Sequence, residues 1–183
     1  MDRERALSEL KARVSNPNLI KHSLAVEAVM RGLAAYLKED AELWGLAGLL
    51  HDIDYDKTAE NPALHSIMGA EILENLDVDP EVVYAVKAHN GCHGIERKRK
   101  LDKALYCADP VSGLITAGAL ILPSRKLADV SAEFILKKMN EKSFARGANR
   151  EQIQKCGELG IAPEQFIELA LTAMKRISAD LGL

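Results

Sequence analysis

The sequence is poor in several features that identify common functional classes. Its three cysteines, Cys92, Cys107 and Cys156, form no CxxC pair, so neither a disulfide framework nor a cysteine-ligated zinc site is indicated. Aromatic residues make up 4% of the chain and the net charge is −3, so the composition offers few stacking side chains and no general attraction for phosphates. On these grounds we expect no nucleic-acid partner.

Long apolar runs are also missing. No stretch of about 18 apolar residues predicts a membrane span. The charged N-terminal sequence MDRERALSELKARV lacks the apolar core of a signal peptide. We therefore expect a cytoplasmic protein without membrane contact, and the sequence leaves its oligomeric state open. With 183 residues, of which 48% are hydrophobic, the chain is long enough for one domain with a sizeable core.

The apolar residues that are present follow a helical period nearly throughout. No run alternates in the way that a half-buried strand requires. We predict an all-α bundle forming a single domain over residues 1–183, with a core of about 15–122 and C-terminal helices of about 130–181 packing on it. The helices are expected in the ranges 6–14, 19–37, 44–50, 62–73, 79–89, 103–122 with a bend near Pro110, 131–140, 150–159 and 163–181.

The dipeptide His51-Asp52 follows the apolar run Trp44–Leu50 and is hard to explain by packing alone. Burial of an unpaired carboxylate is costly, or it forces the group to take up a proton. A metal ion removes this cost because it binds a neutral imidazole and an ionised carboxylate. An aspartate can bridge two ions because it has two oxygens.

Further candidate ligands lie on other predicted helices. All five histidines fall in the first half of the chain, and Asp109 interrupts an apolar helix in the same way as Asp52. A helical bundle can bring such residues together in its core. Taken singly, each has an ordinary interpretation as a hydrogen-bonded core residue, a turn residue or a surface residue. The joint pattern favours a metal site formed by His22, His51, Asp52, His65, His89 and Asp109.

Several motifs resemble the HD-domain superfamily of metal-dependent phosphohydrolases. They are His22-Ser-Leu-Ala-Val-Glu, Leu49-Leu-His51-Asp52-Ile, His65-Ser-Ile-Met-Gly69-Ala-Glu-Ile-Leu73, Ala88-His89-Asn and Ala108-Asp109. The chain is most similar to a group of uncharacterised predicted HD hydrolases, which also resemble it between Lys137 and Glu151. The resemblance spans about residues 15 to 175 and implies an HD-domain helical bundle with the metal site in its core.

The resemblance also implies roles for individual residues. His22, His51, Asp52 and Asp109 match the four ligands of the main metal. His65 and His89 match the two additional histidines of the two-metal branches, in which the residue matching Asp52 bridges the ions and orients metal-bound water for catalysis. Asn90 stands where some two-metal members have another histidine, which leaves positions for water or substrate. The cofactor is one or two divalent ions, with iron, manganese, zinc, nickel and magnesium left open.

The residues after the dyad depart from the common family pattern His-Asp-Ile-Gly-Lys. Here Asp54 replaces the glycine and Tyr55 replaces the lysine, whose phosphate-holding role is therefore in doubt. Asp54 is either a hydrogen-bond partner of a ligand imidazole or a solvated loop acid. Lys57 either substitutes for the missing lysine or is a surface residue.

Substrate contacts are expected from a basic stretch and from one histidine. Lys138, Lys142, Arg146 and Arg150 are spaced by four, so on one helix they line a face, although Gly147 breaks that helix. They form either an electropositive lip for phosphates or a solvated face. His93 matches no ligand position, and we expect it to contact substrate or to have no role in the site.

The first functional hypothesis is a metal-dependent phosphohydrolase that uses metal-activated water on a small phosphate ester or nucleotide. Its expected partner is a small phosphorylated substrate. The alternatives are a mixed-valent di-iron oxygenase, because some HD-domain relatives with the same six ligands are oxygenases, and a non-catalytic metal-binding module.

Overall fold

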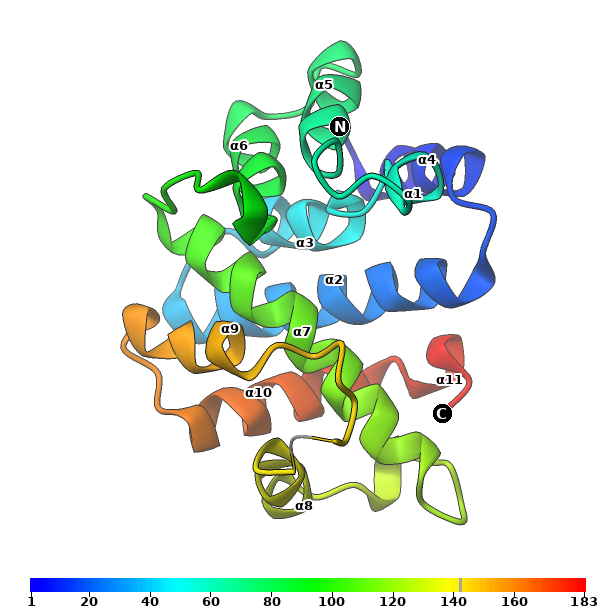
Figure 1. Ribbon diagram of the computed structural model, residues 1–183, viewed down its shortest axis with the longest axis vertical. Coiled ribbons are helices and arrows are strands. Elements are labelled where there is room, and N and C mark those ends of the chain that lie inside the picture. Colours follow the sequence, from blue (N-terminus) through cyan, green and yellow to red (C-terminus); the bar gives the residue numbers. More distant parts are fainter. Residues whose placement is uncertain (142) are drawn as a thin grey trace.

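The computed structural model describes residues 1–141 and 143–183 as helices and connecting segments, without a strand among them. The predicted all-α class is therefore confirmed. The two longest helices, α2 (Pro17–Leu37) and α7 (Lys100–Leu120), cross near the middle of the molecule (Figure 1). The other helices are α1 (Arg3–Arg13), α3 (Ala41–Leu50), α4 (Tyr55–Thr58), α5 (Ile67–Asn75), α6 (Pro80–His89), α8 (Ala132–Met139), α9 (Arg150–Gln154), α10 (Pro163–Arg176) and α11 (Ser178–Leu181), with the 3₁₀ turns η1 (Gly91–His93), η2 (Leu127–Asp129) and η3 (Lys155–Leu159).

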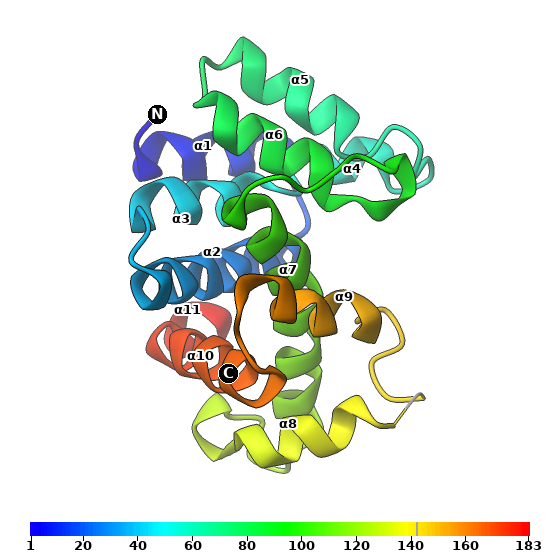
Figure 2. The same ribbon diagram turned by 90° about the vertical axis from the view of Figure 1, so that its left-hand side faces the viewer.

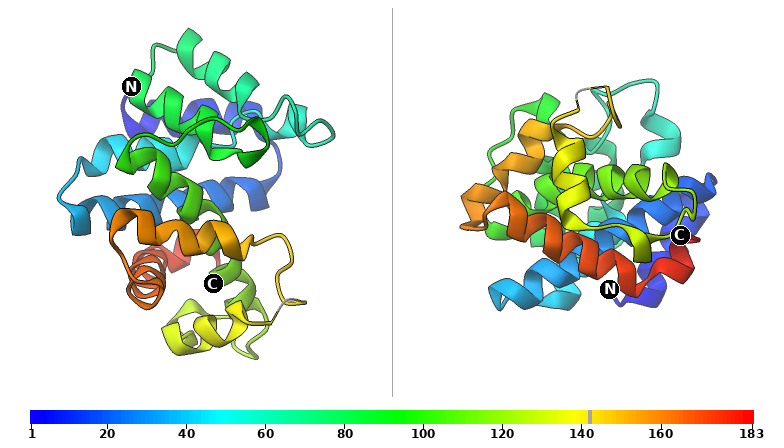
Figure 3. Two further views of the ribbon diagram at one scale, coloured as in Figure 1. Left: turned by 60° about the vertical axis from the view of Figure 1, so that its left-hand side comes forward. Right: turned by 90° about the horizontal axis from the view of Figure 1, so that it is seen from below.

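The helices form layers that α7 connects. Figure 2 shows α5 and α6 at one end, then α1 and α3, then α2, then α10 and α11, with α8 at the opposite end. Seen from below, α10 extends across the layer beneath α2 (Figure 3). The core is continuous through these layers and includes Val26, Leu50, Leu105 and Phe166. No described helix is long and apolar enough to cross a lipid bilayer.

Side-chain caps define where the main helices begin. Asp79 accepts a hydrogen bond from the amide of Glu81, and Pro80 occupies the first turn of α6, as the sequence predicts. Asn16 caps α2 in the same way, again followed by a proline. These caps satisfy amides that have no partner inside the helix.

Two glycines let α3 pack directly against α2. A Cβ atom at Gly48 would lie 2.8 Å from the backbone nitrogen of Glu27, and one at Gly45 would lie 2.6 Å from Nε of Arg31. A larger residue at Gly48 would push the helices apart, whereas one at Gly45 would displace the Arg31 side chain. The close approach brings His51, which follows α3, next to His22 on α2.

A buried carboxylate joins α1 to the same pair of helices. Glu27 accepts hydrogen bonds from Nε of Arg3 at 2.6 Å, from Nη2 of Arg3 at 2.9 Å and from Nε of Arg31 at 2.9 Å. Arg31 also reaches Glu42 at the start of α3, at 2.6 Å.

Some predicted helix boundaries are wrong. Helix α5 begins at Ile67 and not at Pro62, because Ser66 adopts a left-handed conformation with φ 71° that a helix cannot include. Helix α7 runs over Lys100–Leu120 and not 103–122. The expected helix 150–159 is α9 followed by η3, and the expected helix 163–181 is divided into α10 and α11.

Candidate metal centre

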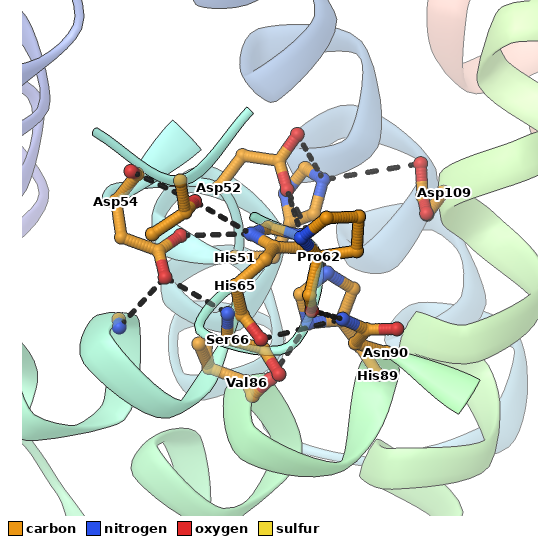
Figure 4. Close-up of polar contacts among 12 residues, drawn as sticks. His51, Asp52, Asp54, Pro62, His65, Ser66, Val86, His89, Asn90 and Asp109 are labelled. Atoms are coloured by element: carbon orange, nitrogen blue, oxygen red, sulfur yellow. Dashed lines mark hydrogen bonds and ion pairs between the residues drawn. The ribbon is translucent and has the colours of Figure 1, made fainter. Parts of the chain in front are cut away.

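All six residues predicted as metal ligands meet at one point in the core. His22 comes from α2, His51 and Asp52 follow α3, His89 ends α6 and Asp109 lies on α7. His65 comes from the turn before α5. Figure 4 shows the side chains of His51, His65 and His89 around Asp52, with Asp109 at the side formed by α7.

The carboxylate of Asp52 faces a different group of imidazoles with each of its oxygens. Its Oδ2 lies 3.4 Å from Nε2 of His51 and 3.9 Å from Nε2 of His22. Its Oδ1 lies 3.3 Å from Nε2 of His65 and 3.6 Å from Nε2 of His89. Each oxygen of this carboxylate could therefore face a cation together with its own group of imidazoles.

The remaining distances on the Oδ2 side suit a metal ion. Nε2 of His22 lies 3.1 Å from Oδ1 of Asp109 and 3.2 Å from Nε2 of His51. Ligands about 2.1 Å from a tetrahedral metal are separated from one another by about 3.4 Å. Two sets of three residues bring their donor atoms within 4.8 Å of one another: His22, His51 and Asp109, and His51, Asp52 and His89. The donor set therefore fits one or two divalent cations.

Two of the imidazoles are oriented by the helices that carry them. Nδ1 of His51 donates to the carbonyl of Gly48 at 2.8 Å, and Nδ1 of His89 donates to the carbonyl of Val86 at 2.6 Å. Both acceptors lie three residues earlier, in the last turn of a helix, where carbonyls lack a helical donor. With the proton on Nδ1, each Nε2 presents a lone pair to the centre.

The other two imidazoles are held by polar side chains. Nδ1 of His22 lies 3.1 Å from Oγ of Ser112, which itself donates to the carbonyl of Asp109 at 2.9 Å. Nδ1 of His65 donates to Oδ1 of Asp54 at 3.0 Å. Sequence reasoning missed Ser112. Its only signal was its position three residues after Asp109, which places both near one face of α7.

Asp54 is a buried partner of His65 and not a solvated loop acid. Its Oδ2 accepts from the amides of Ser66 at 2.8 Å and Gly69 at 2.9 Å, while Oδ1 binds His65. The Ser66 hydroxyl also donates to the carbonyl of Lys87 at 3.2 Å. These bonds hold Ser66 in its left-handed conformation, which is unfavourable for a residue with a side chain. The departure from the family pattern at position 54 thus fixes the turn that carries His65.

The charges of the cluster shift the pKa values of its members in opposite directions. Burial lowers the pKa of His51 below its ordinary value, more than the neighbouring carboxylates raise it. Burial also acts to lower the pKa of His65, but its bonds to Asp52 and Asp54 raise it to about 10. Burial acts to raise the pKa of Asp52, yet the surrounding imidazoles hold it well below its usual range. A cation that binds Nε2 of His65 would therefore displace a proton.

The basic residues predicted to bind substrate do not line one helix. Helix α8 ends at Met139, Arg146 lies in the segment before α9, and Arg150 begins α9. The expected helical stripe is therefore wrong, because the chain turns between residues 143 and 147. Lys142 lies outside the described residues. Lys138 is paired with Glu141 at 2.8 Å.

Arg146 and Arg150 have different surroundings. Arg146 lines a cavity of about 280 Å³ together with His22 and Asp109, so it lies beside the metal centre. The guanidinium of Arg150 instead donates to the carbonyls of Phe144 and Ala145, at 2.5 and 2.6 Å. Arg150 thus holds the segment that carries Arg146.

His93 and Asn90 hold the turn that carries His65. Nε2 of His93 lies 2.7 Å from the carbonyl of His65. Nδ2 of Asn90 donates to the carbonyls of Pro62 at 3.2 Å and His65 at 3.3 Å. Neither contact places the side chain among the donor atoms around Asp52.

The fold and the site define an all-α bundle protein whose core gathers imidazoles and carboxylates for divalent metal. The family model described as HD domain matches residues 19–114, and the chain belongs to this family. The predicted family and the predicted class, a metal-dependent hydrolase, are thereby confirmed.

Curated relatives similar to this chain are named Ribonuclease Y. The protein from Desulforamulus reducens is 32% identical over 180 residues, covering 93% of this chain and 33% of the relative. The protein from Clostridium perfringens is 31% identical over 188 residues, covering 96% and 35%. That from Desulforudis audaxviator is 34% identical over 155 residues, covering 79% and 29%. The chain therefore spans about a third of the length of these relatives.

These relatives overturn the expectation about partners. The small phosphorylated substrate was expected from the phosphohydrolase hypothesis, and the absence of a nucleic-acid partner was inferred from composition, yet the relatives are named as ribonucleases. The inference was wrong because net charge and aromatic content average over the whole surface. They do not report local features such as Arg146 beside the cluster, or Arg97, whose guanidinium lies 3.7 Å from the ring centre of Tyr106.

Proposed function

We propose that this chain is a metal-dependent phosphohydrolase that cleaves phosphodiester bonds of RNA. One observation carries the proposal: four imidazoles, each anchored through Nδ1, direct Nε2 at the two oxygens of the buried Asp52. Membership of the HD-domain family supports the hydrolase class. The similarity to Ribonuclease Y supports RNA as the substrate.

We assign the metal ligands in two groups. His22, His51, Asp109 and Oδ2 of Asp52 would hold one ion, and His65, His89 and Oδ1 of Asp52 would hold a second. A bound divalent cation supplies Lewis acidity and lowers the pKa of a coordinated water. Because four of the six residues offer nitrogen, we expect manganese, iron, zinc or nickel in preference to magnesium, which favours oxygen ligands.

The chain's own residues divide the remaining tasks. Asp109 is the most exposed of the proposed ligands, with 33% of its side chain accessible, whereas His51 is fully buried. Substrate therefore approaches from the side of Asp109, where Arg146 lines the adjoining cavity. Arg146 would contact a phosphate oxygen there, and Arg150 would hold the Arg146 segment in place.

We also propose that residues 1–183 act as one domain. Helix α10 packs against α2 and α8 against α7, so the C-terminal helices are built onto the elements that carry His22 and Asp109.

The test is cleavage of a labelled single-stranded RNA oligonucleotide by protein loaded with manganese, with a DNA oligonucleotide of the same sequence in parallel. We expect RNA cleavage that chelation abolishes and that Asp52→Ala lacks. Hydrolysis of nucleoside monophosphates without RNA cleavage would contradict the assigned substrate. Two bound irons with an oxygen-dependent reaction would favour the oxygenase, and tight metal binding without turnover of any substrate would favour a binding module.

A further inference from the structure

Two hollows in the surface meet at the metal centre. One, of about 280 Å³, is lined by His22, Asp109, Gly113 and the 145–148 segment. The other, of about 450 Å³, also includes His22 and Gly113 and is otherwise lined by Asn18, Lys21, Thr116, Leu120 and residues 181–183. Because both share His22 and Gly113, the two hollows adjoin at these residues.

The second hollow lies between α2 and α7, and we call it the α2–α7 groove. Asp109, Gly113, Thr116 and Leu120 follow one another at steps of four, three and four, which places them on one face of α7. Asn18 and His22 are one turn apart on α2. Figure 1 shows α7 passing α2 and continuing toward α11. Residues 181–183, at the end of α11 and after it, line the groove. The groove thus starts at His22 on its α2 wall, and the neighbouring hollow adds Asp109 on α7.

Gly113 leaves this groove open. A Cβ atom built there meets no heavy atom within 4 Å, so packing does not require glycine. Glycine inside a helix is also less stable than alanine. The residue therefore provides space and not a backbone conformation, and a large side chain at this position would fill the junction of the two hollows.

The lining of the groove is mixed in a way that suits a nucleoside. Lys21, Asn18 and Thr116 offer an ammonium, an amide and a hydroxyl. Leu120, half of whose surface is exposed, and Leu181 offer apolar contacts. Sites for small ligands combine apolar walls with a few polar groups in this manner. A base and ribose have apolar faces and hydrogen-bonding edges, and their phosphate would reach His22 and Asp109.

We propose that the α2–α7 groove binds the nucleoside next to the phosphate held at the metal centre, with Gly113 admitting it. The inference rests on the proposed function only in placing a phosphate beside His22 and Asp109. It adds a position for the sugar and base, which neither the family nor the ligand set specifies.

The test compares binding of adenosine monophosphate and of inorganic phosphate to the manganese-loaded protein by calorimetry. In Gly113→Trp we expect the affinity for adenosine monophosphate to fall by about tenfold or more, which corresponds to about 1.4 kcal/mol, while phosphate affinity changes less than about twofold. Thr116→Trp, one turn further along the groove, should give the same selective loss and serves if Gly113→Trp does not fold.

A matched variant controls for the effect of a bulky side chain at an open glycine. Gly157→Trp places the same residue on another glycine without close neighbours, outside the groove, and should bind adenosine monophosphate as the unmodified protein does. The groove assignment is overturned if Gly113→Trp and Thr116→Trp lose affinity equally for adenosine monophosphate and for phosphate. It is also overturned if neither of these two variants loses affinity for adenosine monophosphate. If RNA is not cleaved but the selective loss is seen, the proposed function fails and the groove stands.

Discussion

Two buried carboxylates, Glu27 and Asp52, are surrounded by opposite kinds of partner. Glu27 receives three hydrogen bonds from the guanidinium groups of Arg3 and Arg31, which are always charged. Asp52 is surrounded by the Nε2 atoms of His51, His65 and other imidazoles. The chain therefore neutralises Glu27 with its own cations.

Among the described residues, Asp52 is paired with histidines and with no arginine or lysine. Each imidazole uses its Nδ1 proton elsewhere, so its Nε2 offers a lone pair to a carboxylate that also offers lone pairs. Lone pairs converging without a donor are unfavourable unless a proton or a metal ion lies between them. The raised pKa of His65, about 10, shows the proton taking that place. Glu27 therefore stabilises the fold, whereas Asp52 is arranged to bind a ligand.

Removal of Asp52 should have the largest effect on metal binding. Asp52→Ala deletes the one group that faces both sets of imidazoles, so we expect manganese affinity to fall by more than about 100-fold, measured by calorimetry. The control is Asp56→Ala, because Asp56 is an exposed carboxylate that accepts from Ser15 and lies outside the cluster. If Asp52→Ala binds manganese with an affinity within threefold of that of the unmodified protein, Asp52 is not a ligand.

Neutralising Glu27 should lower the free energy of unfolding and leave manganese affinity unchanged. Glu27→Gln leaves Arg3 and Arg31 without their shared anion, and we expect the free energy of unfolding to fall by about 3 kcal/mol in urea titrations. Manganese affinity of the folded fraction should not change. Glu42→Gln removes only an exposed partner of Arg31 and should leave the unfolding midpoint close to its original value. Reduced manganese affinity in Glu27→Gln would remove the distinction between the two carboxylates.

Substitution of Asp54 should weaken the metal site through His65. In Asp54→Asn an amide N–H can face Nδ1 of His65, which then moves its own proton to Nε2 and loses the lone pair for metal. We expect manganese affinity to fall by about 10- to 100-fold with the protein still folded. Unchanged affinity would mean that Asp54 acts on the turn at Ser66 and not on the imidazole.

The pKa of His65 predicts the direction of the pH dependence. Because the folded-state pKa is raised from 6.5 to about 10, the charged imidazolium stabilises the metal-free fold fully below pH 6.5, and this stabilisation is lost as pH rises through 10. Metal requires the neutral ring, so manganese affinity should increase between pH 6.5 and 8.5. Calorimetry in buffers of different ionisation enthalpy measures the released protons. Binding without proton release would contradict the assignment of His65.

The smallest effect is expected from Ser112→Ala. The change removes the acceptor of the Nδ1 proton of His22, whose side chain is 23% exposed, so water can replace the hydroxyl. Manganese affinity should fall by about tenfold or less in competition with a chelator. A loss as large as that of Asp52→Ala would give Ser112 a role beyond orienting the ring.

The six proposed ligands could be selected from the sequence because each interrupts an apolar helical pattern. His51, His89 and Asp109 lie at positions where a core residue is expected, so their polarity was itself the signal. The same pattern does not describe a turn. Ser66 is held in its left-handed conformation by hydrogen bonds to Asp54. These bonds join residues that are separated by 12 and 15 positions in the sequence.

The basic residues show a second limit of periodicity. A spacing of four predicts a shared face only while a helix continues, and here the chain leaves α8 at Met139. Arg146 then reaches the cavity beside His22, and Arg150 binds backbone carbonyls. Residues of identical charge thus acquire different roles.

By itself the sequence determined the all-α class, the HD-domain family and a set of polar residues placed where helices bury their side chains. These features follow from the spacing of apolar residues and from residue types, both of which can be read from short segments of the sequence. Only the tertiary structure decided which nitrogen of each histidine faces Asp52, and that a groove opens at Gly113. Both depend on distances between separate helices, which are set by close packing such as that of α3 on α2 at Gly48.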